Sequence, residues 1–170
     1  EVSVAGELIV ALTGASGAAY GRRLLARLVE LTPLHLHLVV SAAALRVLHE
    51  EEGLDLERKP PAEVMRALVG PDPARAEWHP VEDIGASIAS GSFRTIGMVV
   101  CPCSMGTLSS IAHGSSRNLV ERAADVCLKE RRRLVLVPRE APLSLVHLEN
   151  MLAVTRAGAV VMPAAPGFYH

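Results

Sequence analysis

Short apolar runs alternate along this chain with stretches in which apolar residues recur every three or four positions. The first pattern is typical of buried β-strands and the second of amphipathic helices. We expect strands over residues 8–12, 34–40, 98–100, 134–137 and 159–162. We expect helices over residues 18–29, 42–51, 62–68, 108–112, 117–129 and 143–157. Between residues 52 and 97 we expect no further element besides the helix over 62–68, because five prolines break any long element there.

This alternation predicts an α/β fold with a mainly parallel sheet, because short connections between parallel strands require right-handed crossovers. At 170 residues the chain fits one domain, residues 1–170, that buries roughly 70% of the surface of its unfolded form. Half of the residues are apolar but only 3% are aromatic, so the core must consist of Val, Leu, Ile and Ala. That composition is typical of parallel strands covered by helices.

The charge and the cysteines exclude some classes of function. With 17 basic and 18 acidic residues the net charge is −1, which argues against a broad nucleic-acid-binding surface. No apolar run approaches the roughly 20 residues of a membrane span, and residues 1–6 lack the pattern of a secretory signal. Three cysteines make no closed disulfide framework, so we expect a cytoplasmic protein. Because only 21% of the residues are charged, we also expect a homo-oligomer.

Three expected strands end in small or hydroxylic residues just before a helix, at residues 14–17, 41–43 and 104–107. Free N–H groups and the helix dipole favour a phosphate at such places, and the carboxyl ends of parallel strands share one edge of the sheet. The first turn lacks the Gly-x-Gly-x-x-Gly spacing of dinucleotide sites, and a simple helix cap explains a single such turn equally well. Three together favour a mononucleotide such as a flavin.

A charged pair, Arg139 and Glu140, follows the fourth expected strand at the same edge. A buried arginine without a partner is costly, so an anionic ligand is a natural partner for Arg139. Glu140 could instead pair with Arg139 and do nothing more.

Cysteine and histidine pairs do not by themselves predict a metal site. Cys101 and Cys103 lack a second ligand pair, and strand-end cysteines are typically small buried apolar residues. His35 and His37 share one strand face, but two ligands without a third do not make a zinc site. We expect them at the surface or at an interface. Trp78 is expected to be a packing or subunit-contact residue.

Seven short segments, taken in order, carry a family resemblance. They are TGASG (13–17), SGS (90–92), CPCS (101–104), ERAAD (121–125), LKERR (128–132), PREAPL (138–143) and PAAPGFYH (163–170). Any one of them is weak evidence, but the ordered set is specific and spans nearly the whole chain. Together they resemble the UbiX family of flavin prenyltransferases.

The resemblance implies a Rossmann-like, flavodoxin-like three-layer fold that binds FMN at the subunit interface of a homo-oligomer, a dodecamer in family members. Such enzymes join dimethylallyl monophosphate to reduced FMN, at N5 and C6, and so supply prenylated FMN to UbiD-type decarboxylases. No metal is implied, and the chain has no Asp-Asp-x-x-Asp motif. The family pattern continues past Tyr169 with another basic phosphate ligand and a terminal helix, which we expect to be absent here.

The resemblance also implies roles residue by residue. The implied FMN-binding residues are Gly14, Ala15, Ser16, Ser41, Ser104, Met105, Gly106, Thr107 and Arg139. The implied ligands of the allylic phosphate are Ser90, Arg122, Lys129 and Tyr169. The implied catalytic residues are Glu51, Lys129, Glu140 and Ser16. Glu140 is the candidate acid or base of the later ring closure, and Glu51 is placed to stabilise the carbocation or to shuttle protons.

Several of these residues have a purely structural alternative. We expect residues 131–133 to form a solvated helix end that complements the dipole, unlike Lys129. Arg122 could form a surface ion pair with a neighbouring carboxylate. Glu51 lies in an acidic run, residues 50–52, that would ordinarily face solvent, and Tyr169 could be an interface anchor.

Two other functions stay open. An FMN-dependent cysteine decarboxylase of the phosphopantothenoylcysteine type shares the implied fold, but its Pro-x-Met-Asn-x-x-Met-Trp pattern is replaced here by PREAPL at 138–143. A non-catalytic flavin carrier would bind FMN but would not need Lys129 or Glu140.

Overall fold

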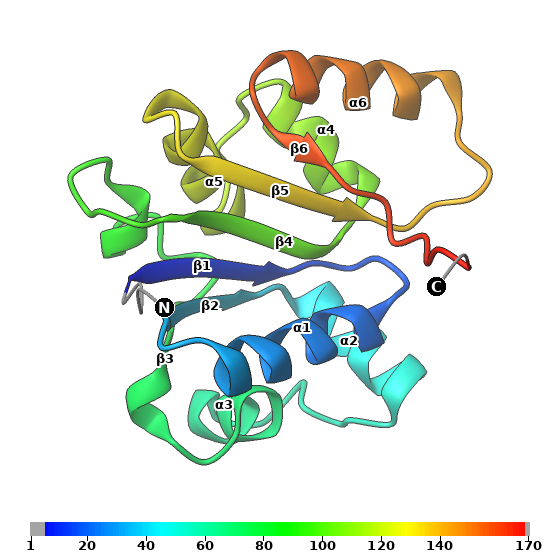
Figure 1. Cartoon of the computed structure of the whole chain (residues 1–170). Coiled ribbons are helices and arrows are strands. Elements are labelled where there is room, and N and C mark those ends of the chain that lie inside the picture. The colour runs from blue at the N-terminus through cyan, green and yellow to red at the C-terminus, as the bar shows by residue number, and fades with distance from the viewer. Residues whose placement is uncertain (1–5, 169–170) are drawn as a thin grey trace.

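A six-stranded, all-parallel sheet forms the centre of the computed structural model, which describes residues 6–168 (Figure 1). Its strands are β1 (Glu7–Leu12), β2 (His35–Val40), β3 (Ala76–Trp78), β4 (Gly97–Cys103), β5 (Arg133–Pro138) and β6 (Val160–Val161). The helices are α1 (Ala18–Leu31), α2 (Ala42–Glu52), α3 (Pro61–Val69), α4 (Met105–Ala112), α5 (Leu119–Lys129) and α6 (Leu145–Arg156). Two short 3₁₀ helices, η1 (Pro73–Arg75) and η2 (Ser87–Ala89), flank β3 and precede β4. The expected α/β class and parallel sheet are confirmed.

Two strands differ from the expectation. The edge strand β3 was not expected, because three residues paired with β2 alone are too short to show an alternating pattern. The strand β4 runs on to Cys103, although the prediction ended it at residue 100. Pro102 explains that error, since a proline donates no backbone hydrogen bond, and the pairing of β4 with β5 is indeed irregular between Val100 and Cys103.

Alternation along β1 divides the core into two parts. Leu8, Val10 and Leu12 point to one face and pack with residues of α1, α2 and α3. Ile9 and Ala11 point to the other face and pack with residues of α4 and α5. A central strand that is apolar on both faces requires helices on both sides, which produces the three-layer arrangement.

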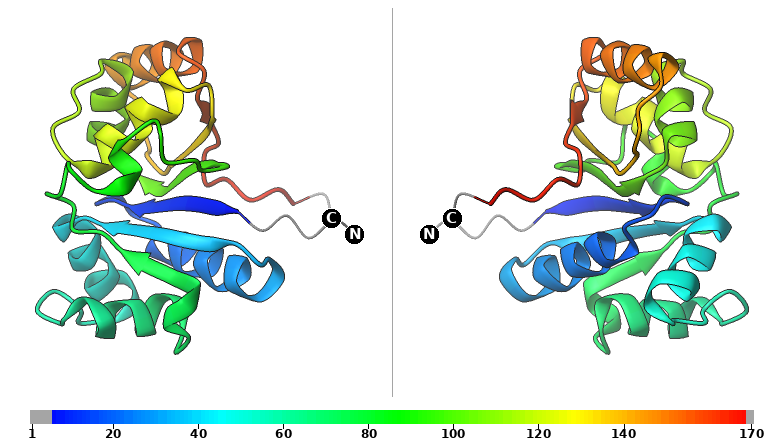
Figure 2. Two further views of the ribbon diagram at one scale, coloured as in Figure 1. Left: turned by 90° about the vertical axis from the view of Figure 1, so that its left-hand side faces the viewer. Right: turned by 90° about the vertical axis from the view of Figure 1, so that its right-hand side faces the viewer.

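The strand order β3-β2-β1-β4-β5-β6 places a topological switch point between β1 and β4. From β1 the chain first adds β2 and β3 on one side, and it later adds β4, β5 and β6 on the other (Figure 1). Two further views show α1, α2 and α3 gathered around the first half and α4, α5 and α6 around the second (Figure 2). Open α/β sheets bind ligands where the carboxyl ends of such strands diverge.

The structure corrects the expectation for His37 and agrees with Trp78 as a packing residue. His37 is only 2% exposed, not at the surface, because the segment after β3 places His79 and Phe93 over it. His35 is half-buried. Trp78 packs against the core beneath α1, α2 and α3, as a packing residue should.

Cys101 and Cys103 are free and buried, as expected for small apolar residues, and so is Cys127. Burial raises the pKa of Cys101 to about 11 and that of Cys103 to about 12, so both thiols stay protonated at neutral pH. None of the helices between residues 6 and 168 has both the length and the apolar character that crossing a bilayer requires.

The packing of α1 against the sheet predicts the effect of one methyl group. A Cβ at Gly21 would lie 2.6 Å from the carbonyl oxygen of Cys101, a backbone atom that cannot swing away. We expect Gly21→Ala to cost about 1–3 kcal/mol of unfolding free energy, measured by denaturant unfolding. Gly85→Ala is the control, because its Cβ would only touch an Asp83 oxygen at 3.4 Å. Equal stability of the two variants would contradict the close contact.

Candidate functional site

Thr13 joins the ends of the two strands at the switch point. Its hydroxyl donates a 2.9 Å hydrogen bond to the carbonyl oxygen of Pro102 and accepts a 2.8 Å bond from the N–H of Ser104. Its own N–H also donates to Pro102 at 3.1 Å. These bonds fix the turn after β1 against the turn after β4. Thr13 was not among the expected site residues, although its place directly after an apolar run at the switch strand could have indicated it.

The turn after β1 closes onto the first turn of α2. A Cβ at Gly14 would lie 2.4 Å from the Cβ of Ala43, so only glycine fits there. Gly17 has a φ of 107°, in the left-handed region that favours glycine. Ser41 caps α2, because its Oγ accepts from the N–H of Ala44 at 3.1 Å. Two of the three expected strand ends therefore meet in space.

The third strand end follows the same pattern. The hydroxyl of Ser104 accepts from the N–H of Thr107 at 3.1 Å and donates to the Thr107 hydroxyl at 2.9 Å. This cap starts α4 at Met105, three residues before the expected start. The N–H groups in the first turn of a helix have no partner within it, so α1, α2 and α4 present donors at this edge.

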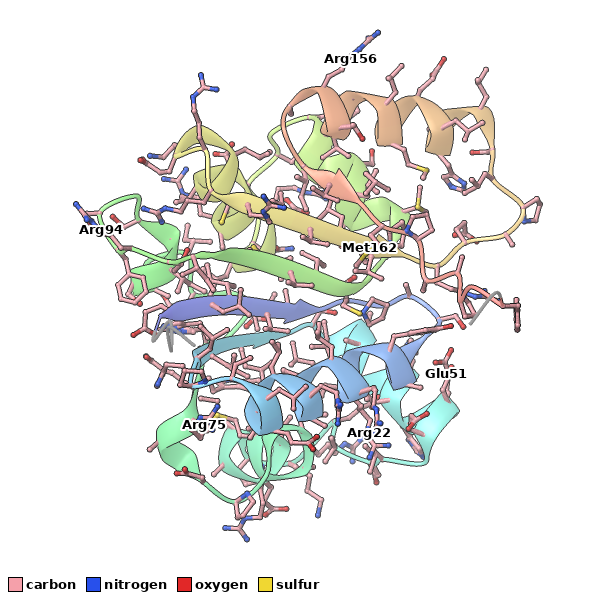
Figure 3. All side chains as sticks on the ribbon, viewed as in Figure 1. Arg22, Glu51, Arg75, Arg94, Arg156 and Met162 are labelled. Carbon is pink, nitrogen blue, oxygen red and sulfur yellow. The ribbon has the colours of Figure 1, made fainter. Side chains whose placement is uncertain are left out.

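Glu51 reaches back from the last turn of α2 to the start of α1. Its carboxylate accepts hydrogen bonds from the N–H groups of Gly17 at 2.9 Å and Ala18 at 2.8 Å. Figure 3 shows Glu51 beside this turn, beyond the carboxyl ends of the strands. The acidic run is thus not simply solvated. Its neighbour Glu52 forms an ion pair with Arg22.

The pKa of Glu51 reflects these contacts. Burial alone raises the pKa by disfavouring the ionised carboxylate. Hydrogen bonds from the Ser16 hydroxyl, from Ala18 and from Gly17, together with the charge of Arg139, outweigh that effect and lower the pKa below its ordinary value. The structure therefore brings together Ser16, Glu51 and Arg139, all of which the resemblance assigned to the site.

Arg139 and Glu140 follow β5 at the same edge. A Cβ at Gly17 would lie 3.9 Å from the Cβ of Arg139, which places Arg139 next to the turn. Both residues are exposed, and Glu140 accepts a 3.2 Å bond from the N–H of Ala141. Within residues 6–168 Glu140 forms no ion pair, so the simple Arg139–Glu140 pair is not observed.

Lys129 and Ser90 lie at the opposite edge of the sheet. Lys129 ends α5 just before β5 begins, and Ser90 follows η2 in the connection to the start of β4. They are near each other, because a Cβ at Gly91 would lie 2.7 Å from the Lys129 Nζ. Lys129 forms an ion pair with Glu130.

Arg132 is not the solvated residue that the sequence suggested. Its guanidinium donates to the carbonyl oxygens of Phe93 at 2.7 Å and Gly91 at 2.6 Å. These bonds hold the segment that carries Ser90 against the end of α5. The sequence pattern could not predict these hydrogen bonds, because their acceptors are backbone carbonyl oxygens, which every residue has.

Arg122 and Tyr169 complete the expected phosphate set. Arg122 lies 3.6 Å from Asp125 on α5 in a partly exposed ion pair, as the structural alternative expected. Tyr169 lies outside the described residues. Phe168, the last described residue, is 93% exposed at the end of a segment that projects from the sheet (Figure 2).

The expected site residues thus form two groups. The turn after β1, the starts of α2 and α4, Glu51 and Arg139 meet at the carboxyl edge of the sheet. Ser90 and Lys129 meet at the amino edge. Figure 3 labels Glu51 of the first group at one side of the molecule and Arg94, which follows Ser90 by four residues in the connection to β4, at the other. One chain does not bring the two groups together.

Comparisons with known proteins agree with the geometry. The family model described as "Flavoprotein" matches residues 3–168. The flavin prenyltransferase UbiX of Alkalihalophilus pseudofirmus is 50% identical over 96% of this chain and 80% of its own length. The UbiX of Pseudomonas aeruginosa is 51% identical over 96% of this chain and 78% of its own length.

Solved structures give the same result. A complex of AnUbiX (PadA1) with FMN and dimethylallyl pyrophosphate superposes with a TM-score of 0.83 and 47% identity, over 96% of this chain and 80% of that one. A dodecameric FMN-dependent UbiX-like decarboxylase from Escherichia coli O157:H7 has a TM-score of 0.82 and 47% identity, over 96% and 82%. The cysteine decarboxylase TvaF, 17% identical with a TM-score of 0.68 over 92% and 88%, shares the fold alone. The chain therefore belongs to the flavoprotein family and, within it, to the UbiX flavin prenyltransferases.

Proposed function

We propose that this protein joins dimethylallyl monophosphate to reduced FMN and so makes prenylated FMN. The observation that carries the proposal is the meeting of three helix N-termini with Glu51 and Arg139 at the switch point, in a chain about half identical to UbiX enzymes. The solved relative bound to FMN and dimethylallyl pyrophosphate supports the same pair of ligands. We propose a single FMN-binding domain for residues 1–170.

The carboxyl edge fits the phosphate of FMN. Gly14 and Gly17 leave the turn without side chains that would block an approaching ligand, and the first turns of α2 and α4 offer N–H donors. Gly14, Ala15, Ser16, Ser41, residues 104–107 and Arg139 would hold the cofactor. Reduced FMN, when bound, supplies the electron-rich N5 and C6 atoms that accept the prenyl group.

The allylic phosphate site is proposed to lie between subunits. Ser90 and Lys129 are at the amino edge, whereas Glu51 and Arg139 are at the carboxyl edge of the same chain. A second copy must therefore bring its amino edge to the first copy's flavin site. The E. coli neighbour, which is dodecameric, supports such an assembly. The apolar residues that α6 exposes, Leu145, Val146, Leu148 and Leu152, supply a surface for it.

The cations of this site act on the leaving group. Breaking the allylic carbon–oxygen bond leaves negative charge on the phosphate, which Lys129 and Arg122 stabilise by about 3–4 kcal/mol for a well-aimed donor. Tyr169 is proposed as a further donor. A monophosphate neutralised in this way needs no magnesium, and the Arg132 bonds to Gly91 and Phe93 keep the Ser90 segment in position.

The carboxylates act on the prenyl carbons and on protons. Glu51 is held ionised by its hydrogen bonds, so it can stabilise positive charge on the allyl group or accept a proton. Glu140 is exposed beside Arg139 and is the proposed acid or base of ring closure. The product would serve a UbiD-type decarboxylase. Three free thiols support a reducing, cytoplasmic location.

Lys129→Met tests the chemistry directly. We expect prenylated FMN formation from reduced FMN and dimethylallyl monophosphate to fall about 10²–10³-fold, while FMN binding is retained. Anaerobic incubation followed by flavin mass measurement gives the rate, and Arg131→Met is the matched cationic control. A flavin carrier would make no prenylated product even in the wild type. A cysteine decarboxylase would instead release CO₂ from a peptidyl cysteine.

A mixed oligomer tests the division of the site between subunits. Gly14→Val should abolish FMN binding by steric collision with Ala43, and Lys129→Met should impair prenyl transfer. If the two edges come from different copies, co-expressed and co-purified mixed oligomers regain activity that neither parent has. Mixtures no more active than the parents would show that each chain builds its own complete site.

The lowered pKa of Glu51 predicts a pH effect on stability. A carboxyl whose pKa is lower in the folded state stabilises the fold above its unfolded pKa of about 4.5, and this stabilisation disappears as the pH falls through the folded pKa. Glu51→Gln should therefore lower the Tm at neutral pH and flatten the fall of Tm below pH about 5, relative to Glu50→Gln. Thermal unfolding followed by circular dichroism measures both. Parallel Tm curves for the two variants would contradict the assignment.

A further inference from the structure

A cluster of histidines and carboxylates lies away from the flavin edge, on the sheet face that α4 and α5 cover. In the parallel register His37 on β2 stands between Ile9 on β1 and Glu77 on β3. Residues two apart on a strand share a face, so Glu7 joins the cluster from β1, and His79, just past β3, joins it from the other side. Segments of three strands thus place three polar side chains, Glu7, Glu77 and His79, around the buried ring of His37.

Both nitrogens of the His37 ring have partners. Nε2 lies 2.8 Å from a carboxylate oxygen of Glu7, and Nδ1 lies 2.9 Å from Nε2 of His79. Phe93 packs edge-on against the ring, with centroids 5.1 Å apart. A neutral His37 that donates its Nε2–H to Glu7 has its Nδ1 lone pair directed at His79 and Glu77.

We propose that His37 Nδ1, His79 Nε2 and the Glu77 carboxylate form a binding site for a divalent transition-metal ion of the zinc type. Ligand atoms of each of the three residues lie within 4.8 Å of one another. The pair of nitrogens is 2.9 Å apart, and Glu77 oxygens lie 3.8 Å from each of them. Ligands of a tetrahedral zinc ion at about 2.0–2.1 Å are about 3.3 Å apart, between these values.

Glu7 has the place of the outer carboxylate that supports many zinc-bound histidines. Such a carboxylate accepts the other ring N–H, which fixes the tautomer and directs the free nitrogen at the metal. Glu7 does this to His37, and its side chain is 39% exposed whereas the ring is buried. Two imidazoles and a carboxylate are a typical ligand set for zinc, with a fourth position for water.

Charge and access agree with a cation. Within residues 6–168 the ion pairs of Glu7 and Glu77 are all with histidine rings, so no lysine or arginine neutralises the two carboxylates. Glu77 is 56% exposed, which opens the site to solvent.

A metal here would have a structural role that does not rest on the proposed function. It would tie the edge strand β3 and the segment after it to β2. That segment continues through η2 to Ser90 and Phe93, and Phe93 already packs on His37. The site lies apart from the carboxyl edge, so its occupancy can be measured whether or not the protein transfers a prenyl group.

Titration with Zn²⁺ alone tests the proposal on the whole chain after treatment with a chelator. We expect one saturable zinc ion per chain by calorimetry. Cobalt substitution should give visible d–d bands without a thiolate charge-transfer band, because the buried cysteines are not ligands. Zinc at about 100 times its Kd should raise the Tm by about 5–10 °C.

Variants identify the ligands without removing the buried rings. Glu7→Gln should weaken zinc binding about 10–100-fold, and Glu77→Gln should weaken it further and abolish the rise in Tm. Glu63→Gln, in an exposed pair with Lys59, is the matched control and should bind zinc as the wild type does. No saturable binding, or equal binding by Glu77→Gln and the wild type, would overturn the proposal and leave a chain of hydrogen bonds only.

Discussion

The pairing of β1 with β4 is the contact on which the rest of the structure depends. It is the point where strand addition reverses, and Thr13 extends it beyond the sheet through its bonds to Pro102 and Ser104. Because both strand ends are fixed there, α1 and α4, which cover opposite faces of the sheet, both start with their N–H groups at the same edge. The proposed flavin site is a consequence of this constraint and needs few special side chains: glycines that leave room, hydroxyls that cap helices, and one arginine.

The sequence predicted helices and strands correctly where burial makes apolar residues recur at regular positions. Strands β1 and β2 and helices α1, α2 and α3 came within two residues of their observed ends, since long apolar patterns report burial directly. The edge strand β3 left no such pattern in its three residues. Missing β3 also hid Glu77 and His79, so His37 seemed to lack further ligands. Without β3 in the predicted sheet, the sequence could not show that Glu77 and His79 contact His37.

The site was predictable to a different extent. The strand ends at Gly14, Ser41 and Ser104 followed from chain pattern alone, because parallel strands must end at one edge. Glu51 did not, since an acidic run at a helix end is usually solvated, and only the family resemblance assigned it a role. Its bonds to Gly17 and Ala18 depend on how α2 packs beside α1. That packing is part of the tertiary structure and leaves no pattern in the local sequence. The same is true of Arg132.

The separation of the two residue groups has an electrostatic reason in the proposed composite site. Helix N-termini favour anions, so the carboxyl edge, where α1, α2 and α4 begin, is a poor place for additional lysines. Helix C-termini favour cations, and Lys129 ends α5. In this chain α5 ends just before β5 begins, so Lys129 lies at the amino edge, whereas the last turn of α2 lies at the carboxyl edge and brings an acidic residue, Glu51, to the start of α1. Contact between the carboxyl edge of one copy and the amino edge of another would combine the two groups, and Lys129 would stay at the helix end that stabilises its charge.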